Sequence, residues 1–196
     1  MVNELTGEEI RALLKLEPHA TCGFVRVTFM SEKRIAAGGL PPPFAEGRPA
    51  GSALYFMVTP DAPVRLHRIR NDQLYHYYLG DPIEVLMLRT DGTSERAVVG
   101  PDLRSGQRVQ LFIPGNTFHT ARLAPESFRG WFLGASTEWP GVEPADVEIG
   151  DVDSLAEKYP DAADDLRAFQ QGRVIDLNRP WANLISPWQK EKAQVD

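Results

Sequence analysis

Histidines and tyrosines in two short runs are the residues of this sequence best suited to chemistry. His67 and His76 lie in the run RLHRIRNDQLYHYYLGDP, residues 65–82, and His119 ends the run IPGNTFH. An imidazole can bind a divalent metal ion through one ring nitrogen, and it exchanges a proton near neutral pH. The pattern therefore indicates either a metal centre or an acid–base site.

The residues around these histidines alternate as they do in β-strands, which assigns them to faces. Successive side chains of a strand point to opposite faces of the sheet. Two sets are each expected to share a face: Gln73, Tyr75 and Tyr77 on one strand, and Arg65, His67 and Ile69 on the strand before it. His76 is expected to point away from Gln73.

Short strands separated by turn residues must position these side chains. Nine segments are rich in β-branched and aromatic residues, and they cover residues 23–30, 52–59, 64–69, 73–79, 83–89, 94–99, 107–114, 118–124 and 129–137. Asp91-Gly92 is a two-residue hairpin signal, because glycine tolerates a positive φ. We expect a mainly β fold, a sandwich or barrel, rather than a parallel α/β sheet.

Helical patterns occur at both ends of this β region. Thr6 and Glu9 have the spacing of a capping box, and they predict a short helix over residues 6–15. Ser154 with Glu157, and then DAADDLRAF, indicate two more. The Pro-rich loop at 31–51 is too long for a hairpin, and it predicts a lid, a partner-contact arm or a disordered segment.

Charge and composition restrict the class of partner. The chain has 27 acidic and 21 basic residues, a net charge of -6, and these charges are interspersed. This argues against nucleic acid or an anionic membrane, and favours a small molecule. Cys22 is the only cysteine, which excludes an internal disulfide. The N-terminus lacks a signal-peptide pattern and no apolar run is long enough to span a membrane, so we expect a cytoplasmic protein.

Several segments together resemble the cupin_5 family, also called the DUF985 proteins. They are LEPHATCGFVRVTFMS, SALYFMVTP, LHRIRNDQLYHYYLGDP, GPDLRSGQ and IPGNTFHTARL. The resemblance implies a compact cupin jelly-roll β-barrel, usually a homodimer, that holds a small ligand at its mouth. It also implies one cupin domain over residues 1–151. We expect residues 152–196, with Trp181 and Trp188, to pack on that domain or on a partner subunit.

The resemblance also implies a metal set, from which this sequence departs at two positions. Ile69 stands where a metal-binding cupin has its second histidine, and Gln73 stands where it has a glutamate. His119 does occupy the histidine position of the second motif. The resulting set of His67, Gln73 and His119 is uncharged, so we expect it to bind Fe, Mn, Ni or Zn more weakly than a set with a carboxylate. No organic cofactor is expected.

Two functions from different classes follow. The first is a metal-dependent isomerase, lyase or oxygenase, with His76, Tyr75 or Tyr77 moving the proton. The second is a metal-free barrel, with or without isomerase activity, that binds a sugar, nucleotide or amino-acid-like ligand. In both cases the substrate-binding candidates are Arg65, Tyr55, Phe112 and Phe118. A weaker third option is an interaction module that uses the Pro-rich loop and the tail.

Overall fold

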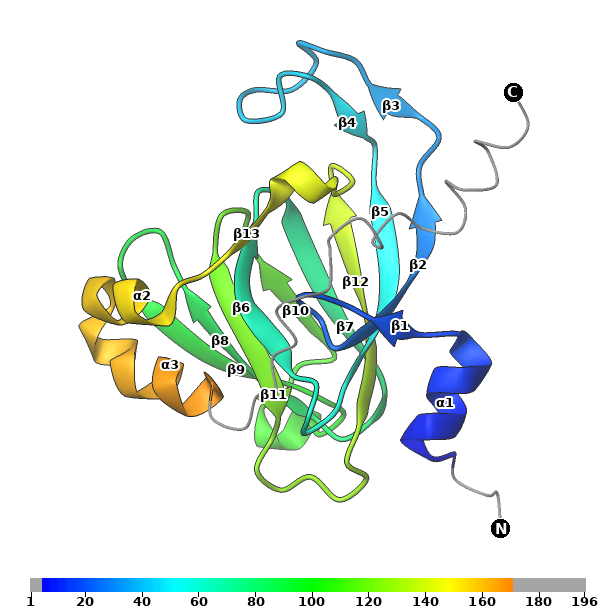
Figure 1. Ribbon diagram of the computed structural model, residues 1–196, viewed down its shortest axis with the longest axis vertical. Helices are drawn as coiled ribbons and strands as arrows, with labels where there is room; N and C mark the ends of the chain where they lie inside the picture. The colour runs from blue at the N-terminus through cyan, green and yellow to red at the C-terminus, as the bar shows by residue number, and fades with distance from the viewer. Residues whose placement is uncertain (1–4, 171–196) are drawn as a thin grey trace.

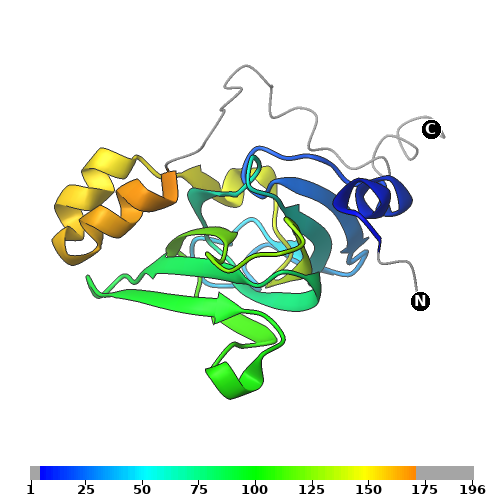
Figure 2. The same ribbon diagram turned by 90° about the horizontal axis from the view of Figure 1, so that it is seen from below.

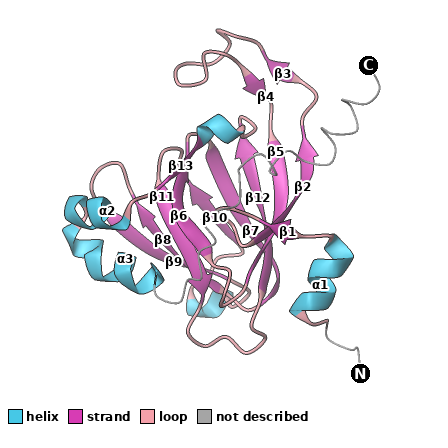
Figure 3. Ribbon diagram, in the orientation of Figure 1, coloured by secondary structure: helices cyan, strands magenta, loops and turns pink. Residues whose placement is uncertain are grey.

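Two antiparallel β-sheets packed face to face form the body of the protein (Figures 1 and 3). The computed structural model describes residues 5–170, with the side chain of Gln170 left out. Strands on the two inner faces enclose a core, as in a jelly-roll barrel. The predicted mainly β fold and its flanking helices are therefore confirmed.

The strand order of both sheets is non-sequential. One sheet runs in the order β1 (Glu17–Pro18), β2 (Phe24–Met30), β5 (Ser52–Val58), β12 (Phe132–Trp139), β7 (Asp72–Gly80) and β10 (Gln110–Ile113). The second runs in the order β13 (Val147–Ile149), β6 (Val64–Ile69), β11 (Phe118–Leu123), β8 (Ile83–Leu88) and β9 (Ser94–Val99). Each predicted strand segment overlaps one of these strands. Asp91-Gly92 lies in the turn that connects β8 to β9.

The main core lies between the two sheets and is built by alternation. Its members are apolar or aromatic and almost fully buried, and they include Phe56, Val58, Val64, Tyr75, Ile83, Met87, Ile113 and Phe132. On β5 the alternate residues Tyr55 and Met57 point to the opposite, outer face of the sheet. Burying one such side chain contributes roughly 1.5–3 kcal/mol, so this cluster supplies much of the stability of the fold.

Helices cover the outer faces of both sheets (Figure 2). α1 (Gly7–Leu14) carries the predicted capping box of Thr6 and Glu9, and its Ile10 packs with Trp131 and Leu133. α2 (Val152–Lys158) and α3 (Ala163–Gln170) cover the five-stranded sheet. α2 begins before Ser154, because the Asp151 side chain caps it by accepting from the Ser154 amide. In the part of the chain that is described, no helix is long and apolar enough to cross a membrane.

The predicted loop at 31–51 forms an arm that is held to the barrel by a buried ion pair. It contains the short strands β3 (Arg34–Ile35) and β4 (Arg48–Pro49) and projects beyond the sheets (Figure 1). Arg48 binds Asp146 bidentately, with N–O distances of 3.0 and 2.8 Å. Asp146 lies just before β13, so the arm is anchored rather than disordered.

Removing Arg48 should destabilise the protein strongly. The Arg48→Ala variant leaves the Asp146 carboxylate buried without its partner, which costs about 3–5 kcal/mol. Arg34→Ala is the matched control, since the Arg34 side chain is 54% exposed where it pairs with Glu143, and exposed pairs contribute roughly 0–1 kcal/mol. Urea denaturation measures both free energies of unfolding. Equal losses would show that the Arg48 pair does not stabilise the barrel.

Candidate functional site

His67 and His119 meet inside the barrel, as the two sequence motifs predict. They are register partners on the neighbouring strands β6 and β11. Their ring centroids lie 4.4 Å apart with the ring planes tilted by 52°. His67 is 3% exposed and His119 is fully buried. The structure therefore brings the two imidazoles together at a position shielded from bulk solvent.

A β-bulge in β6 changes the faces expected around His67. His67 pairs with His119 and Val64 pairs with Ala121, so β6 has one residue more than β11 between these pairs. Val64 packs in the core, whereas Leu66 packs under the outer helices. The alternation that would give Arg65 and His67 a common face is therefore broken. What Arg65 supplies to the site is its carbonyl oxygen, 2.6 Å from the His67 Nδ1 atom.

Hydrogen bonds to backbone carbonyls define the tautomer of His119. Its Nδ1 lies 3.2 Å from the Thr117 carbonyl oxygen, which can only accept, so Nδ1 carries the proton. Its Nε2 then accepts from the Tyr75 hydroxyl at 2.9 Å. Burial, with the nearby His67 as a second cause, holds the pKa of His119 well below its usual value. His119 is therefore a neutral imidazole in the folded protein.

Tyr75 is the buried hydrogen-bond donor of this pair. Its ring is 1% exposed and packs against Phe56, with the two centroids 4.7 Å apart. Burial raises the pKa of Tyr75 well above its usual value. Burial also raises the pKa of the neighbouring Cys22 thiol to about 11, so a thiolate nucleophile is not available there. Tyr75 and His119 are thus neutral and form a hydrogen-bonded pair.

Gln73 lies near this pair on the inner face of β7, and its amide is incompletely bonded. Its side chain is 3% exposed, and among the described residues its Nε2 has no hydrogen-bond partner. Its Oε1 lies 3.4 Å from the Ser136 hydroxyl, which is a long contact. A buried donor without an acceptor costs about 1–3 kcal/mol, so this amide is suited to bind a polar group that enters the barrel.

Glu138 is a buried carboxyl that the sequence analysis missed. It is 4% exposed, and it is the register partner of both Ser52 and Gln73. The predicted strand ended at Thr137, two residues before β12 ends at Trp139, and so left Glu138 out. Alternation on β12 would have found it, because Phe132, Gly134, Ser136 and Glu138 have the same parity. Burial raises the pKa of Glu138, although the two serine hydroxyls oppose this.

The other predicted catalytic residues lie apart from the two imidazoles. The Nε2 of His76 contacts the Thr137 hydroxyl at 2.9 Å, and its Nδ1 contacts the Gln110 amide nitrogen at 3.0 Å. The Tyr77 hydroxyl donates to the Gly80 carbonyl oxygen. His76 is thus held on the opposite face of β7 from Tyr75, as expected. Tyr77 shares the inner face but uses its hydroxyl locally.

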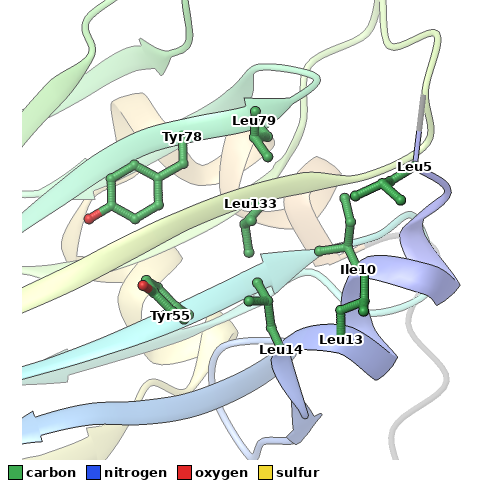
Figure 4. Close-up of a pocket in the computed structure, with 8 residues that line it drawn as sticks. All are labelled: Leu5, Ile10, Leu13, Leu14, Tyr55, Tyr78, Leu79 and Leu133. Carbon is green, nitrogen blue, oxygen red and sulfur yellow. The ribbon is translucent and has the colours of Figure 1, made fainter. Parts of the chain in front are cut away.

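The predicted aromatic substrate-binding residues do not gather around His67. Tyr55 lies in an apolar groove outside the barrel, between α1 and the sheet (Figure 4). Phe118 packs under the C-terminal helices, where the Arg68 guanidinium lies over its ring. Phe112 is 53% exposed. Since both faces of the sheets are covered, a buried aromatic is not necessarily inside the barrel.

The donor atoms present make a weak set for a resident divalent metal ion. Among residues 5–170, no group of three His, Cys, Asp or Glu side chains could hold one. The His119 Nε2 atom, which would have to bind the metal, already accepts from Tyr75. Ile69 and Gln73 supply no negative charge. Tyr75 and His119 instead form a hydrogen bond with each other.

The comparisons with known proteins decide the family. The family described as "Cupin superfamily (DUF985)" matches residues 8–150. The chain belongs to this family. A curated relative, the uncharacterized protein YML079W of Saccharomyces cerevisiae, is 26% identical over 97 residues, which are 49% of this chain and 48% of the relative. The matched segment thus spans about half the length of the relative.

Two solved structures share the fold of this cupin. A hypothetical protein from Leishmania major has a TM-score of 0.77 and 24% identity, with 84% of this chain and 98% of that chain covered. Protein SO0799 from Shewanella oneidensis has a TM-score of 0.73 and 23% identity, with 86% and 99% covered. At this level of identity the similarity establishes the fold alone, so function must be argued from the site.

Removing the Tyr75 hydroxyl should cost more stability than removing that of Tyr77. Tyr75→Phe leaves the buried His119 Nε2 without its donor, a loss of about 1–3 kcal/mol. Tyr77→Phe removes a partly buried hydrogen bond to a carbonyl, which contributes roughly 0.5–1.5 kcal/mol. Chemical denaturation of both variants checks the order. A smaller loss for Tyr75→Phe would contradict the assigned hydrogen bond.

The stability should decrease in mild acid because of His119. Its folded pKa lies below the unfolded value of about 6.5, so the unfolded state binds the additional proton as the pH falls. The contribution of neutral His119 to the free energy of unfolding is complete above about pH 6.5. Below that pH the free energy of unfolding falls by about 1.4 kcal/mol per pH unit. Glu138, with a raised pKa, acts in the opposite direction.

Comparison with a His119→Gln variant isolates the contribution of His119. Free energies of unfolding are measured for both proteins from pH 7.5 to 5. We expect a shallower decrease in the variant. Parallel curves would show that His119 is not neutral in the folded protein.

Proposed function

We propose that this cupin binds a small polar ligand inside its barrel without a resident metal ion, and that Tyr75 and His119 transfer a proton to or from it. The proposal rests on one observation, the buried hydrogen bond of 2.9 Å between Tyr75 Oη and His119 Nε2. The unbonded Gln73 amide on the same strand face supports it. An isomerase or a lyase step needs this kind of proton transfer.

The roles of the two residues follow from their protonation states. Neutral His119 can accept a proton at Nε2, while its Nδ1 stays bonded to the Thr117 carbonyl. Tyr75 can donate its hydroxyl proton to a developing oxyanion, for which burial makes a hydrogen bond stronger than it would be in water. Burial, with the nearby His67 as a second cause, lowers the pKa of His119 and keeps its imidazole uncharged. The pair is thus suited to general acid–base chemistry.

A metal-dependent enzyme is the second candidate, and one observation favours it. The Nδ1 atoms of His67 and His119 both contact backbone carbonyl oxygens, an arrangement that orients metal-binding histidines in many proteins. Iron, manganese, nickel or zinc would then be held by these two residues with Gln73. This candidate requires Tyr75 to give up its hydrogen bond to His119.

The assembly is also a proposal. We propose a cytoplasmic homodimer of a single cupin domain over residues 1–151, with residues 152–196 as a covering segment. α2 and α3 support the covering role, because they pack on the outer face of the five-stranded sheet. The tail residues Trp181 and Trp188 lie outside the described residues. Light scattering at micromolar concentration tests the dimer, and a monomer would contradict it.

Elemental analysis of tag-free protein, purified without chelators, separates the two candidates. We expect no stoichiometric iron, manganese, nickel or zinc in the natural protein or in the His67→Ala and His119→Ala variants. Near-stoichiometric metal that is lost in both variants would overturn the metal-free proposal in favour of the metal-dependent enzyme. Circular dichroism confirms that each variant is folded.

A further inference from the structure

A row of three polar side chains crosses the inner face of the six-stranded sheet. Glu138 on β12 is directly opposite Ser52 on β5 and Gln73 on β7. Directly opposed side chains have Cβ atoms about 4.5–5.5 Å apart. All three are at most 7% exposed. The carboxyl that position 73 lacks is therefore present on the neighbouring strand, in the same row.

The hydrogen bonds of Glu138 hold its carboxyl in one position. The Ser136 hydroxyl donates to Oε1 and the Ser52 hydroxyl donates to Oε2, both at 2.5 Å. The Val142 amide in turn donates to the Ser52 oxygen at 3.1 Å. Within residues 5–170 Glu138 has no ion pair with a basic side chain. The carboxyl is thus oriented by neutral groups alone.

The Gln73 amide completes the row with hydrogen-bonding capacity that the protein does not use. Its Nε2 has no partner in the described structure. The hydrogen of Ser136 is committed to Glu138, because that contact is 2.5 Å whereas the contact with Gln73 Oε1 is 3.4 Å. A donor and an acceptor of a buried amide are therefore both left for a bound group.

We propose that Glu138 and Gln73, oriented by Ser52 and Ser136, form the part of the ligand site that binds a neutral hydroxyl-bearing group, as in a sugar or polyol. This rests on the proposed function and specifies its ligand class. A hydroxyl group can accept from Gln73 Nε2 and donate to Glu138 Oε at the same time. A carboxylate or phosphate would enter a buried site that has a carboxyl and no paired cation, which is unfavourable.

The position of the row connects it to the proton-transfer pair. Gln73 and Tyr75 are two residues apart on the same face of β7, a separation of about 6.6 Å along the strand. A ligand of about that length, bound by Gln73 through one hydroxyl, could therefore present another of its carbon atoms to Tyr75 and His119.

The test compares neutral and anionic ligands of the same carbon skeleton. The probes are hexoses and hexitols against hexuronates and hexose phosphates, measured by saturation-transfer NMR and calorimetry. We expect the natural protein to bind neutral probes more tightly than anionic ones. We expect Glu138→Gln to weaken that binding at least tenfold. Glu157→Gln, on the exposed face of α2, is the matched control and should leave it unchanged.

An exchange variant keeps the inference testable if Glu138→Gln folds poorly. Gln73→Glu combined with Glu138→Gln keeps one carboxyl and one amide in the row and moves the carboxyl back to position 73. We expect it to fold and to recover part of the affinity for neutral probes. Circular dichroism and thermal unfolding report folding separately from binding.

The outcomes distinguish this inference from the proposed function. If Glu138→Gln binds like the natural protein, or if anionic probes bind as tightly as neutral ones, the inference is overturned. In those cases the proposed function stands if His119→Ala still abolishes binding. If neither class of probe binds the natural protein, the inference is overturned, while the proposed function keeps its own test in the elemental analysis and in the Tyr75→Phe and His119→Gln variants.

Discussion

Most side chains on the inner faces of the two sheets are removed from water, and this constraint governs the chemistry of the barrel. A polar group placed there must find a partner inside the protein or bind one that enters. His119 bonds to Tyr75 and to the Thr117 carbonyl, and Glu138 bonds to two serines. The Gln73 Nε2 atom, in contrast, has no hydrogen-bond partner among the described residues. Among the described residues, Gln73 is thus the polar side chain of the barrel strands whose hydrogen bonding is left incomplete.

The same constraint determines which groups carry charge. Burial opposes ionisation of His119, Tyr75 and Cys22, and it shifts their pKa values in the directions that keep them neutral. A neutral imidazole can accept a proton from a ligand while a neutral phenol donates one to it, so the pair as a whole need not gain net charge. This chemistry is compatible with Ile69 and Gln73, which carry no charge, at the two positions where the sequence departs from the metal-binding motif.

The sequence predicted the strands well, because alternation and turn residues are local signals. It also predicted the meeting of His67 with His119, since both motifs carry a histidine. It could not predict the bulge before His67, because a register shift depends on the partner strand β11. Nor could it separate Tyr55 and Phe118 from residues of the interior. Helices bury the outer faces as well, so alternation shows which residues share a face but not which face is inside.

The ion pair of Arg48 and Asp146 has a consequence for how quickly a ligand can enter. It joins residues 98 positions apart and ties the arm to the segment that follows β12. The arm continues into β5 at Ser52, and the Gly141 amide of the β12–β13 segment donates to the Pro49 carbonyl. Both segments therefore border the end of the barrel where Glu138 lies. On the proposed function, a ligand that entered at that end would have to pass between them, and its association rate would then depend on local opening of the arm.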